Sequence, residues 1–160
     1  MIVKRAYKYR IYPNREQRNF FARTFGCVRL FYNTSLDDMN KLYKEKKEYK
    51  DITPASYKER FPFFKEVDSL ALANAQLNRN KALKSFFRKQ NKFPKFKAKR
   101  NKQSYSTNNQ NGTVYLSEDS KYISLPKIKN IKIKMHRKFD GVIKTVTVSK
   151  ECDDTYYVSI

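Results

Sequence analysis

The first dozen residues alternate between apolar and charged side chains. Most odd positions from Val3 to Ile11 are apolar, several even positions are basic, and Pro13 ends the pattern. A period of two residues is typical of a strand with one buried face and one face in water. We therefore predict a strand over residues 2–12, with Lys8 and Arg10 on its wet face.

Helical spacing follows this strand. Asn14 with Gln17 three residues later predicts a capped helix start, and Phe21 and Phe25 before Gly26 predict a short helix that ends at the glycine.

Three more helices are predicted. A stripe of apolar residues with spacings of three and four runs from 28 to 43. Thr53 and Pro54 indicate a brief helix before Pro62, and Asp68 is placed to cap a fourth helix that extends past Leu83. The sequence thus predicts a small bundle of four helices.

A period of two returns in the last third of the chain, between turn-like clusters of Asn, Asp, Ser and Gly. The apolar positions of these expected strands are Val114 and Leu116, Ile123 and Leu125, Ile131 and Ile133, Val142 to Val148, and Tyr156 to Ile160. Alternation of this kind predicts antiparallel strands. We expect an α+β fold, in which one β-barrel is interrupted after its first strand by a helical insertion. Because Ile160 lies inside an apolar strand, we expect the chain to be truncated.

The chain is strongly basic. Its 160 residues include 36 Lys and Arg against 15 Asp and Glu, a formal net charge of +21, and its aromatics are all Tyr and Phe. With 39% hydrophobic residues it is too apolar for a disordered polycation, so we expect a folded protein that binds a polyanion. Cys27 and Cys152 have no metal-ligand spacing, and no apolar run is long enough for a membrane span. We expect a protein of a reducing cytoplasm, where RNA and DNA are the abundant polyanions.

The binding signal lies in a stretch that contains no acid between Asp68 and Glu118. Cations alternate there with rings, a pattern that suits phosphate contacts with stacked bases. We predict phosphate contacts for Lys8, Arg10, Arg29, Arg88, Lys89, Lys92, Lys95, Lys97, Lys99, Arg100 and Lys102. Phe93, Phe96 and Tyr105 either stack on bases or belong to the core.

A different pattern follows at 104–110, where the residues are polar but uncharged. Its Asn and Gln side chains can read a base edge, although an ordinary loop explains the run equally well. The acidic doublets at 37–38, 118–119 and 153–154 indicate solvated helix faces and turns, and His136 is the only histidine. We therefore predict neither a catalytic centre nor a metal site.

Several short motifs occur in a fixed order. They are Arg10-Ile11-Tyr12-Pro13 with Glu16-Gln17, then Gly26, Arg29 and Tyr32-Asn33, then Ala82 with Phe86-Phe87, then Phe93-Pro94-Lys95-Phe96-Lys97 with Lys99-Arg100 and Ser104-Tyr105. This ordered set resembles the N-terminal half of TnpB (OrfB) proteins, the RNA-guided DNA endonucleases of bacterial insertion sequences.

The resemblance implies a split wedge domain, an oligonucleotide-binding-like barrel formed by residues 1–12 and 93–160, with a helical recognition insertion over 13–92. It implies two partners, a guide RNA from the end of the insertion sequence and double-stranded target DNA. By local alignment, the side chains that read a target-adjacent DNA motif are Ser56, Ser69, Asn74, Thr107 and Asn108. Ala73 and Arg79 depart from the family pattern.

The same resemblance implies that the nuclease lies elsewhere. In the family, a RuvC-like domain with divalent metal and a zinc ribbon would follow residue 160. We therefore expect this chain to be inactive alone and to hold no cofactor. Two other functions fit the residues: a nuclease-less regulator that binds DNA through guide RNA or a helix-turn-helix, and a general RNA-binding protein. The sequence does not predict an oligomeric state.

Overall fold

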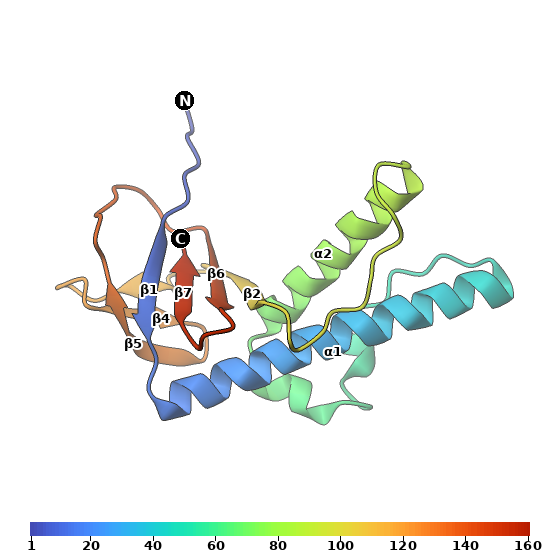
Figure 1. Cartoon of the computed structure of the whole chain (residues 1–160), viewed down its shortest axis with the longest axis horizontal. Helices are drawn as coiled ribbons and strands as arrows, with labels where there is room; N and C mark the ends of the chain where they lie inside the picture. The colour runs from blue at the N-terminus through green and yellow to red at the C-terminus, as the bar shows by residue number, and fades with distance from the viewer.

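The architecture combines one antiparallel sheet with two long helices, which confirms the α+β class. The computed structural model describes residues 1–160 (Figure 1). In chain order its elements are β1 (Lys8–Tyr12), α1 (Arg15–Lys46), the 3-10 helices η1 (Pro54–Tyr57) and η2 (Pro62–Glu66), α2 (Ser69–Phe87), β2 (Gln103–Asn108), β3 (Tyr115–Leu116), β4 (Tyr122–Leu125), β5 (Ile128–Lys134), β6 (Thr145–Lys150) and β7 (Tyr156–Ser159).

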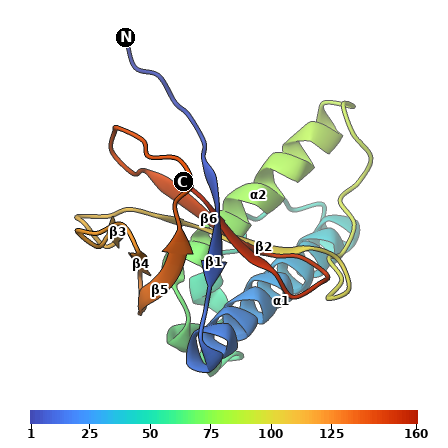
Figure 2. The same cartoon turned by 60° about the vertical axis from the view of Figure 1, so that its left-hand side comes forward.

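The sheet joins the two ends of the chain. Its seven strands have the order β2-β6-β7-β1-β5-β4-β3, so that β1 lies between β7 and β5. β2 and β3 are edge strands that do not pair with one another, and the sheet is therefore open rather than a closed barrel (Figure 2). The predicted first strand is too long, because β1 begins only at Lys8 and the side chains of Met1 and Ile2 are almost fully exposed.

The polar run after residue 102 forms a strand that the sequence pattern does not predict. Residues 103–108 make β2, which pairs with β6 along its whole length. Tyr105 and Thr107 are buried while their neighbours are not, so the period of two is present, but mostly in polar residues. Conversely, the strand predicted to include Val142 is shorter, because β6 starts at Thr145 and Val142 is exposed.

Helix α1 begins as predicted and ends much later. Asn14 accepts a hydrogen bond from the backbone N–H of Gln17, whose side chain accepts one from the backbone N–H of Asn14, which confirms the capping box. The helix then continues through Gly26 to Lys46, so the prediction that it ends at Gly26 is wrong. A continuous buried stripe before and after residue 26 explains this, because its burial outweighs the ~1 kcal/mol by which glycine disfavours a helix interior.

The first two predicted helices are one helix, α1, the brief third is the 3-10 helix η1, and the fourth is α2. The 3-10 helix η2 is a further short turn that the sequence pattern does not predict. The segments that begin at Pro54 and Pro62 form only 3-10 helices of four and five residues, too short to act as members of a bundle. The start of α2 is confirmed, since the Asp68 carboxylate accepts a hydrogen bond from the backbone N–H of Leu70.

A single hydrophobic core unites helices and sheet. Thirty buried residues form one cluster, which draws on α1, α2 and the strands. On the sheet side Tyr105 and Tyr156 contact the rings of α1, and the centroids of Phe21 and Tyr105 lie 6.2 Å apart. α1 thus packs across the inner face of the sheet, and α2 meets β2 at one edge.

Candidate nucleic-acid interface

The N-terminal end of α2 is fixed to β2 by a buried carboxylate. Asp68 is 3% exposed and accepts hydrogen bonds from the Leu70 amide and from the Thr107 hydroxyl, the latter at 2.5 Å. Burial raises the pKa of Asp68, and the hydrogen bond from Thr107 opposes that rise. One side chain therefore caps a helix and ties it to the sheet.

Two asparagines meet further along α2. The Asn74 amide nitrogen donates to the Asn108 side-chain oxygen at 2.8 Å and to the Ser106 carbonyl at 2.9 Å. Both asparagines are half-buried, and they come from α2 and β2 respectively. We call Asp68, Asn74, Thr107 and Asn108 the α2–β2 corner. Its contacts bring two of the predicted motif-reading residues together.

The chain between α2 and β2 has no regular structure, yet it is fastened to α1. We call residues 88–102 the basic segment; Figure 1 shows it returning from the end of α2 along α1. Asn33 of α1 donates its amide to the Lys97 carbonyl at 2.9 Å and accepts from the Lys97 amide at 2.7 Å. The Lys97 ammonium also lies 4.8 Å from the centroid of the Tyr32 ring. This clamp holds the middle of the segment in an extended path.

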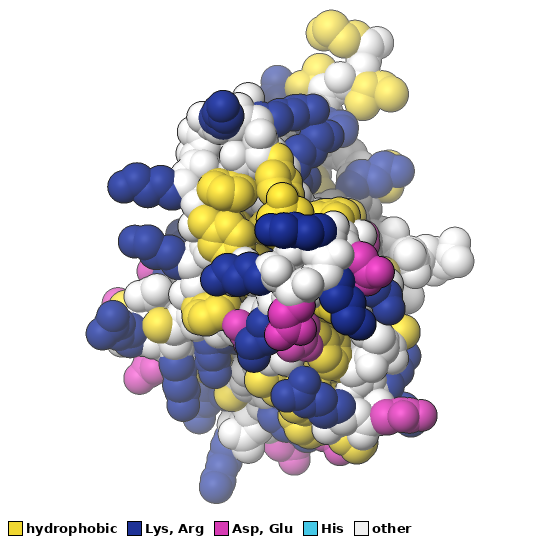
Figure 3. All heavy atoms as spheres, turned by 90° about the vertical axis from the view of Figure 1, so that its right-hand side faces the viewer, with side chains coloured by type: hydrophobic (Ala, Val, Ile, Leu, Met, Phe, Trp, Pro, Cys, Tyr) yellow, Lys and Arg dark blue, Asp and Glu magenta, His cyan; other side chains and the backbone are white.

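Almost all cations of the basic segment lack an acidic partner. Lys102 lies 3.1 Å from Glu151, and the other cations of the segment have no carboxylate within 4 Å. All of them are exposed. The face at the C-terminal ends of α1 and α2 shows a group of hydrophobic side chains surrounded by many Lys and Arg side chains, with acidic side chains among them (Figure 3).

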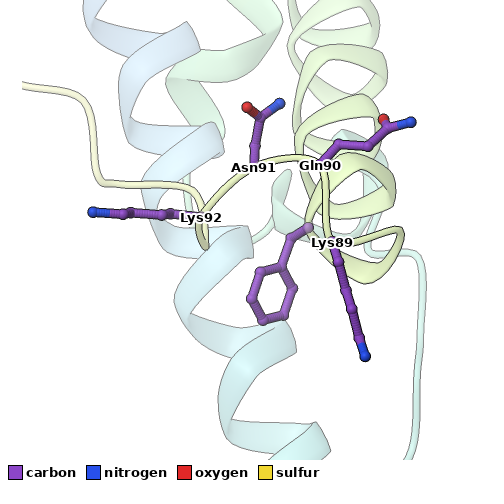
Figure 4. A pocket seen from close by; sticks show the side chains of 5 residues that line it. Lys89, Gln90, Asn91 and Lys92 are labelled. Carbon is purple, nitrogen blue, oxygen red and sulfur yellow. The ribbon is translucent and has the colours of Figure 1, made fainter.

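The turn after α2 spreads its side chains in several directions. Lys89 and Lys92 point away from one another, while Gln90 and Asn91 lie on a third side of the loop (Figure 4). Together with Phe86 these residues line a shallow, open hollow. It is too open to enclose a small molecule, but it presents cations from more than one side.

The rings of this region are outside the core. Phe93 is 38% exposed and Phe96 60% exposed, whereas Tyr105 is 3% exposed and packs on Phe21 and Phe25. The Phe93 ring packs edge-on against Phe86, with 5.2 Å between the centroids, whereas the Phe96 ring is open to solvent. Tyr105 is a core residue. Its hydroxyl has no hydrogen-bond partner, and burial raises the pKa of Tyr105.

The remaining predicted residues are dispersed. Arg29 donates to the Gln103 side chain at 3.0 Å. Lys8 and Arg10 lie on β1, and the Lys8 ammonium is 3.8 Å from the same Glu151 oxygen that Lys102 of the basic segment approaches. Ser56 and Ser69 are exposed, but Ser56 donates to the Thr53 carbonyl and no hydrogen bond joins either serine to the asparagine pair. Thr107 is fully buried and its hydroxyl is engaged by Asp68, so its side chain faces inward.

Two residues that position the interface are not predicted as such by the sequence. Asn33 appears there only within a motif, and Asp68 only as a helix cap. Their further contacts are with Lys97 and Thr107, 64 and 39 residues away in the chain. No local pattern encodes such a contact, although an asparagine inside a helix is a weak helix former and its presence there is a signal of another role.

The acidic residues of the turns at 118–119 and 153–154 serve local roles. Asp119 accepts hydrogen bonds from Ser117 and Lys121, and Asp153 accepts from Thr155; these side-chain hydrogen bonds lower the pKa of both carboxyls. No three His, Cys, Asp or Glu side chains gather where they could hold a metal ion. Neither helix is apolar enough over a sufficient length to cross a bilayer.

Known proteins that match this chain come from one group. A family model described as a helix-turn-helix domain, that of OrfB proteins of the IS605 type, matches residues 1–48. A Streptomyces pristinaespiralis protein with the provisional name RNA-guided DNA endonuclease is 37% identical over 61% of this chain. An Escherichia coli (strain K12) protein provisionally named RNA-guided DNA endonuclease InsQ is 28% identical over 97% of the chain. The chain is similar to insertion-sequence proteins of the TnpB/OrfB type.

The matches cover part of each relative. They span 26% of the length of the Streptomyces protein and 39% of that of InsQ. Within the OrfB helix-turn-helix match, residues 15–46 form the single helix α1, without a turn between two helices.

Proposed function

We propose that this chain is the nucleic-acid-binding half of a TnpB-type RNA-guided DNA endonuclease, which holds a guide RNA and reads a target-adjacent motif in double-stranded DNA. The observation that carries the proposal is the basic segment, an exposed run of cations without acidic partners that is clamped to α1. Bringing like charges together costs free energy unless a polyanion neutralises them. The relatives' names, which specify RNA guidance and DNA cleavage, support the same assignment.

In this proposal the open sheet is the wedge domain and residues 13–92 are the recognition insertion. The single core favours a rigid unit, in which the RNA-binding cations and the α2–β2 corner keep a constant separation. Such rigidity suits a protein that must hold one nucleic acid at a defined distance from another.

The α2–β2 corner supplies chemistry for reading a base. Because the Asn74 amide nitrogen is engaged within the protein, its side-chain oxygen stays available as an acceptor. The Asn108 amide nitrogen has only a long contact, 3.4 Å to Thr145, and is available as a donor. An acceptor beside a donor matches the major-groove edge of adenine, which offers N6–H and N7. We infer an adenine in the motif.

RNA binding is tested with the 1–160 chain by fluorescence anisotropy. The probes are RNA from the 3′ end of the element that encodes the chain and an unrelated structured RNA of equal length. We expect at least a tenfold preference for the first, and an affinity that falls by roughly a thousandfold or more between about 50 and 200 mM salt if six or more phosphates are contacted. Equal affinity for both RNAs would instead establish a general RNA-binding protein.

Motif reading is tested separately, with a duplex library randomised at the target-adjacent positions and bound by the RNA complex. Selection should enrich one position for adenine, and Asn108→Ala should abolish that enrichment while the affinity for RNA stays unchanged. Lys121→Gln is the control, because this exposed residue lies in the turn before β4. Enrichment that survives Asn108→Ala contradicts the assignment.

The regulator that binds DNA through a helix-turn-helix is not favoured. That mode requires a recognition helix set at an angle to its predecessor by a short turn. In this chain the residues that match the helix-turn-helix domain contain one strand and one unbroken helix.

A further inference from the structure

The face of the sheet opposite to α1 is a second cationic surface, which adjoins the end of the basic segment where Lys8 and Lys102 both approach Glu151. Strand register places its side chains in rows across the strands. In the first row Lys132 of β5 stands between Tyr122 of β4 and Tyr12 of β1. In the second row Arg10 of β1 stands between Lys134 of β5 and Tyr157 of β7. We call these six residues the outer platform.

The outer platform alternates rings with positive charges. Tyr12 is 45% exposed and Tyr122 41% exposed, and both lysines are exposed. The Arg10 guanidinium lies 5.1 Å from the Tyr12 ring centroid and 5.8 Å from that of Tyr157. These cation–π contacts hold the arginine between two rings, so that the platform is ordered before any ligand arrives.

No ion pair balances the charges of the platform, although Arg10 is among the groups that lower the pKa of Asp153. Arg10 and Lys134 are direct cross-strand partners, a pairing of like charges that destabilises a sheet. Neither residue, nor Lys132, has a carboxylate within 4 Å, and the buried Nε atom of Arg10 has no hydrogen-bond partner. An anion placed between the two strands would relieve the repulsion and give the guanidinium an acceptor.

A hydroxyl-rich zone continues the platform toward the far edge of the sheet. Ser149 of β6 is the cross-strand neighbour of Tyr157, and Ser104 of β2 follows it. Beside them Ser106 and Thr147 are joined by a 2.7 Å hydrogen bond. Ser149 is buried, so the exposed Ser104 and the half-buried Ser106 and Thr147 make this half of the face low and polar, with donors and acceptors that suit ribose 2′-hydroxyls.

We propose that the outer platform binds an unpaired segment of RNA, with bases stacked on Tyr12 and Tyr122 and phosphates held by Lys132, Lys134 and Arg10. This inference rests on the proposed function and specifies where unpaired nucleotides of the guide RNA lie. Rings on a flat sheet stack on exposed bases, which a duplex keeps inside its helix. Tyr12 and Tyr122 are two strands apart, about 10 Å at the usual strand spacing, with Lys132 between them.

The chain contains no tryptophan, so single tryptophans can report stacking. The probes are Tyr12→Trp and Tyr122→Trp, titrated with decauridine and with deoxythymidine of the same length. The matched control is Tyr43→Trp on α1, because Tyr43 is 48% exposed and also has a cation over its ring, Lys47 at 5.3 Å. We expect decauridine to quench both platform tryptophans at least twofold and to leave the control unchanged.

Charge removal gives a second readout. Arg10→Gln with Lys134→Gln should reduce the affinity for decauridine about tenfold and lower the salt slope by roughly 0.7 for each phosphate that the protein no longer neutralises. Lys58→Gln with Lys65→Gln, an equal change of charge at exposed positions around η1 and η2, should leave both unchanged.

The outcomes separate this inference from the proposed function. If the chain binds its RNA tightly but the platform tryptophans are not quenched, the platform inference is wrong and the proposed function stands. Equal quenching by the DNA decamer overturns the assignment to RNA. If no RNA is bound at all, both the proposed function and the platform are wrong.

Discussion

The α2–β2 corner and the basic segment are neighbours along the chain, and they treat polar groups in opposite ways. The buried charged groups of the corner and of α2 are satisfied inside the protein: Asp68 by Thr107, and the fully buried Arg79 by the Ile52 carbonyl and the Asp51 carboxylate. In the basic segment, only Lys102 has an acidic partner. A charged side chain therefore indicates an external binding partner only where no group of the protein itself pairs with it.

Among the predicted substitutions, the largest effect on stability is expected at Arg79 of α2. Arg79→Ala should reduce the free energy of unfolding by ~3 to 5 kcal/mol, because it leaves a cavity and deprives buried polar groups of their donor. Arg79→Met, of similar volume, should restore a good part of that stability. Urea denaturation followed by circular dichroism measures both. A change below ~1 kcal/mol for the alanine variant would mean that this charge is dispensable.

The basic segment should show the reverse behaviour. Changing Lys95, Lys97, Lys99 and Arg100 together to glutamine should weaken RNA binding about a hundredfold, which corresponds to ~2.7 kcal/mol. The midpoint of urea unfolding should move little, since exposed cations without partners contribute little to stability. The control changes Arg15, Arg18, Lys44 and Lys46 of α1, which are also exposed, to glutamine. If the control loses as much affinity for RNA, the basic segment contributes only through the overall charge of the protein.

Substitution of Asp68 tests whether the α2–β2 corner stabilises the fold by joining α2 to β2. Asp68→Ala should reduce the free energy of unfolding by ~2 kcal/mol, because it removes both the cap of α2 and the acceptor of Thr107. Asp68→Asn keeps an acceptor for the Leu70 amide and should cost less. Urea denaturation of the two variants side by side checks the order, and equal stability of both would argue against the cap.

The pH dependence of the corner has a defined sign. The folded pKa of Asp68 is raised by burial, so the folded state holds this proton more tightly than the unfolded state. Its contribution to stability is therefore full below the unfolded pKa, and it is lost as the pH rises through the folded pKa. Comparing Asp68→Asn with the unaltered chain from about pH 3 to 6 should isolate this contribution. An identical pH profile for the two proteins would contradict it.

The smallest expected effect concerns Gly26. A Cβ atom there would meet only the Arg29 guanidinium, at 3.9 Å, and the residue is within a continuous helix. Gly26→Ala should therefore stabilise the protein by ~0.5 to 1 kcal/mol, which raises the melting temperature by a few degrees. RNA binding should be unchanged. A destabilised variant would indicate that the helix needs to bend at this position.

Local features are predictable where the interaction is local. The capping box at Asn14 and the cap at Asp68 each depend on residues within three positions, and both predictions are confirmed. The prediction of a helix end at Gly26 is wrong because a glycine ends a helix only where no buried stripe of side chains continues past it. β2 escapes prediction as a strand because most of its residues are polar, and its partner β6 lies far away in the sequence.

The sequence alone determined that the protein is basic, that it is α+β, and that cations concentrate where acids are missing. These properties follow from composition and from the periodicities of strands and helices. The tertiary structure decided which polar groups are free, because hydrogen bonds between Asn33 and Lys97 or between Asp68 and Thr107 depend on packing across 64 and 39 residues. It also decided that Tyr12, Lys132 and Tyr122 form one row, since only strand pairing sets that register.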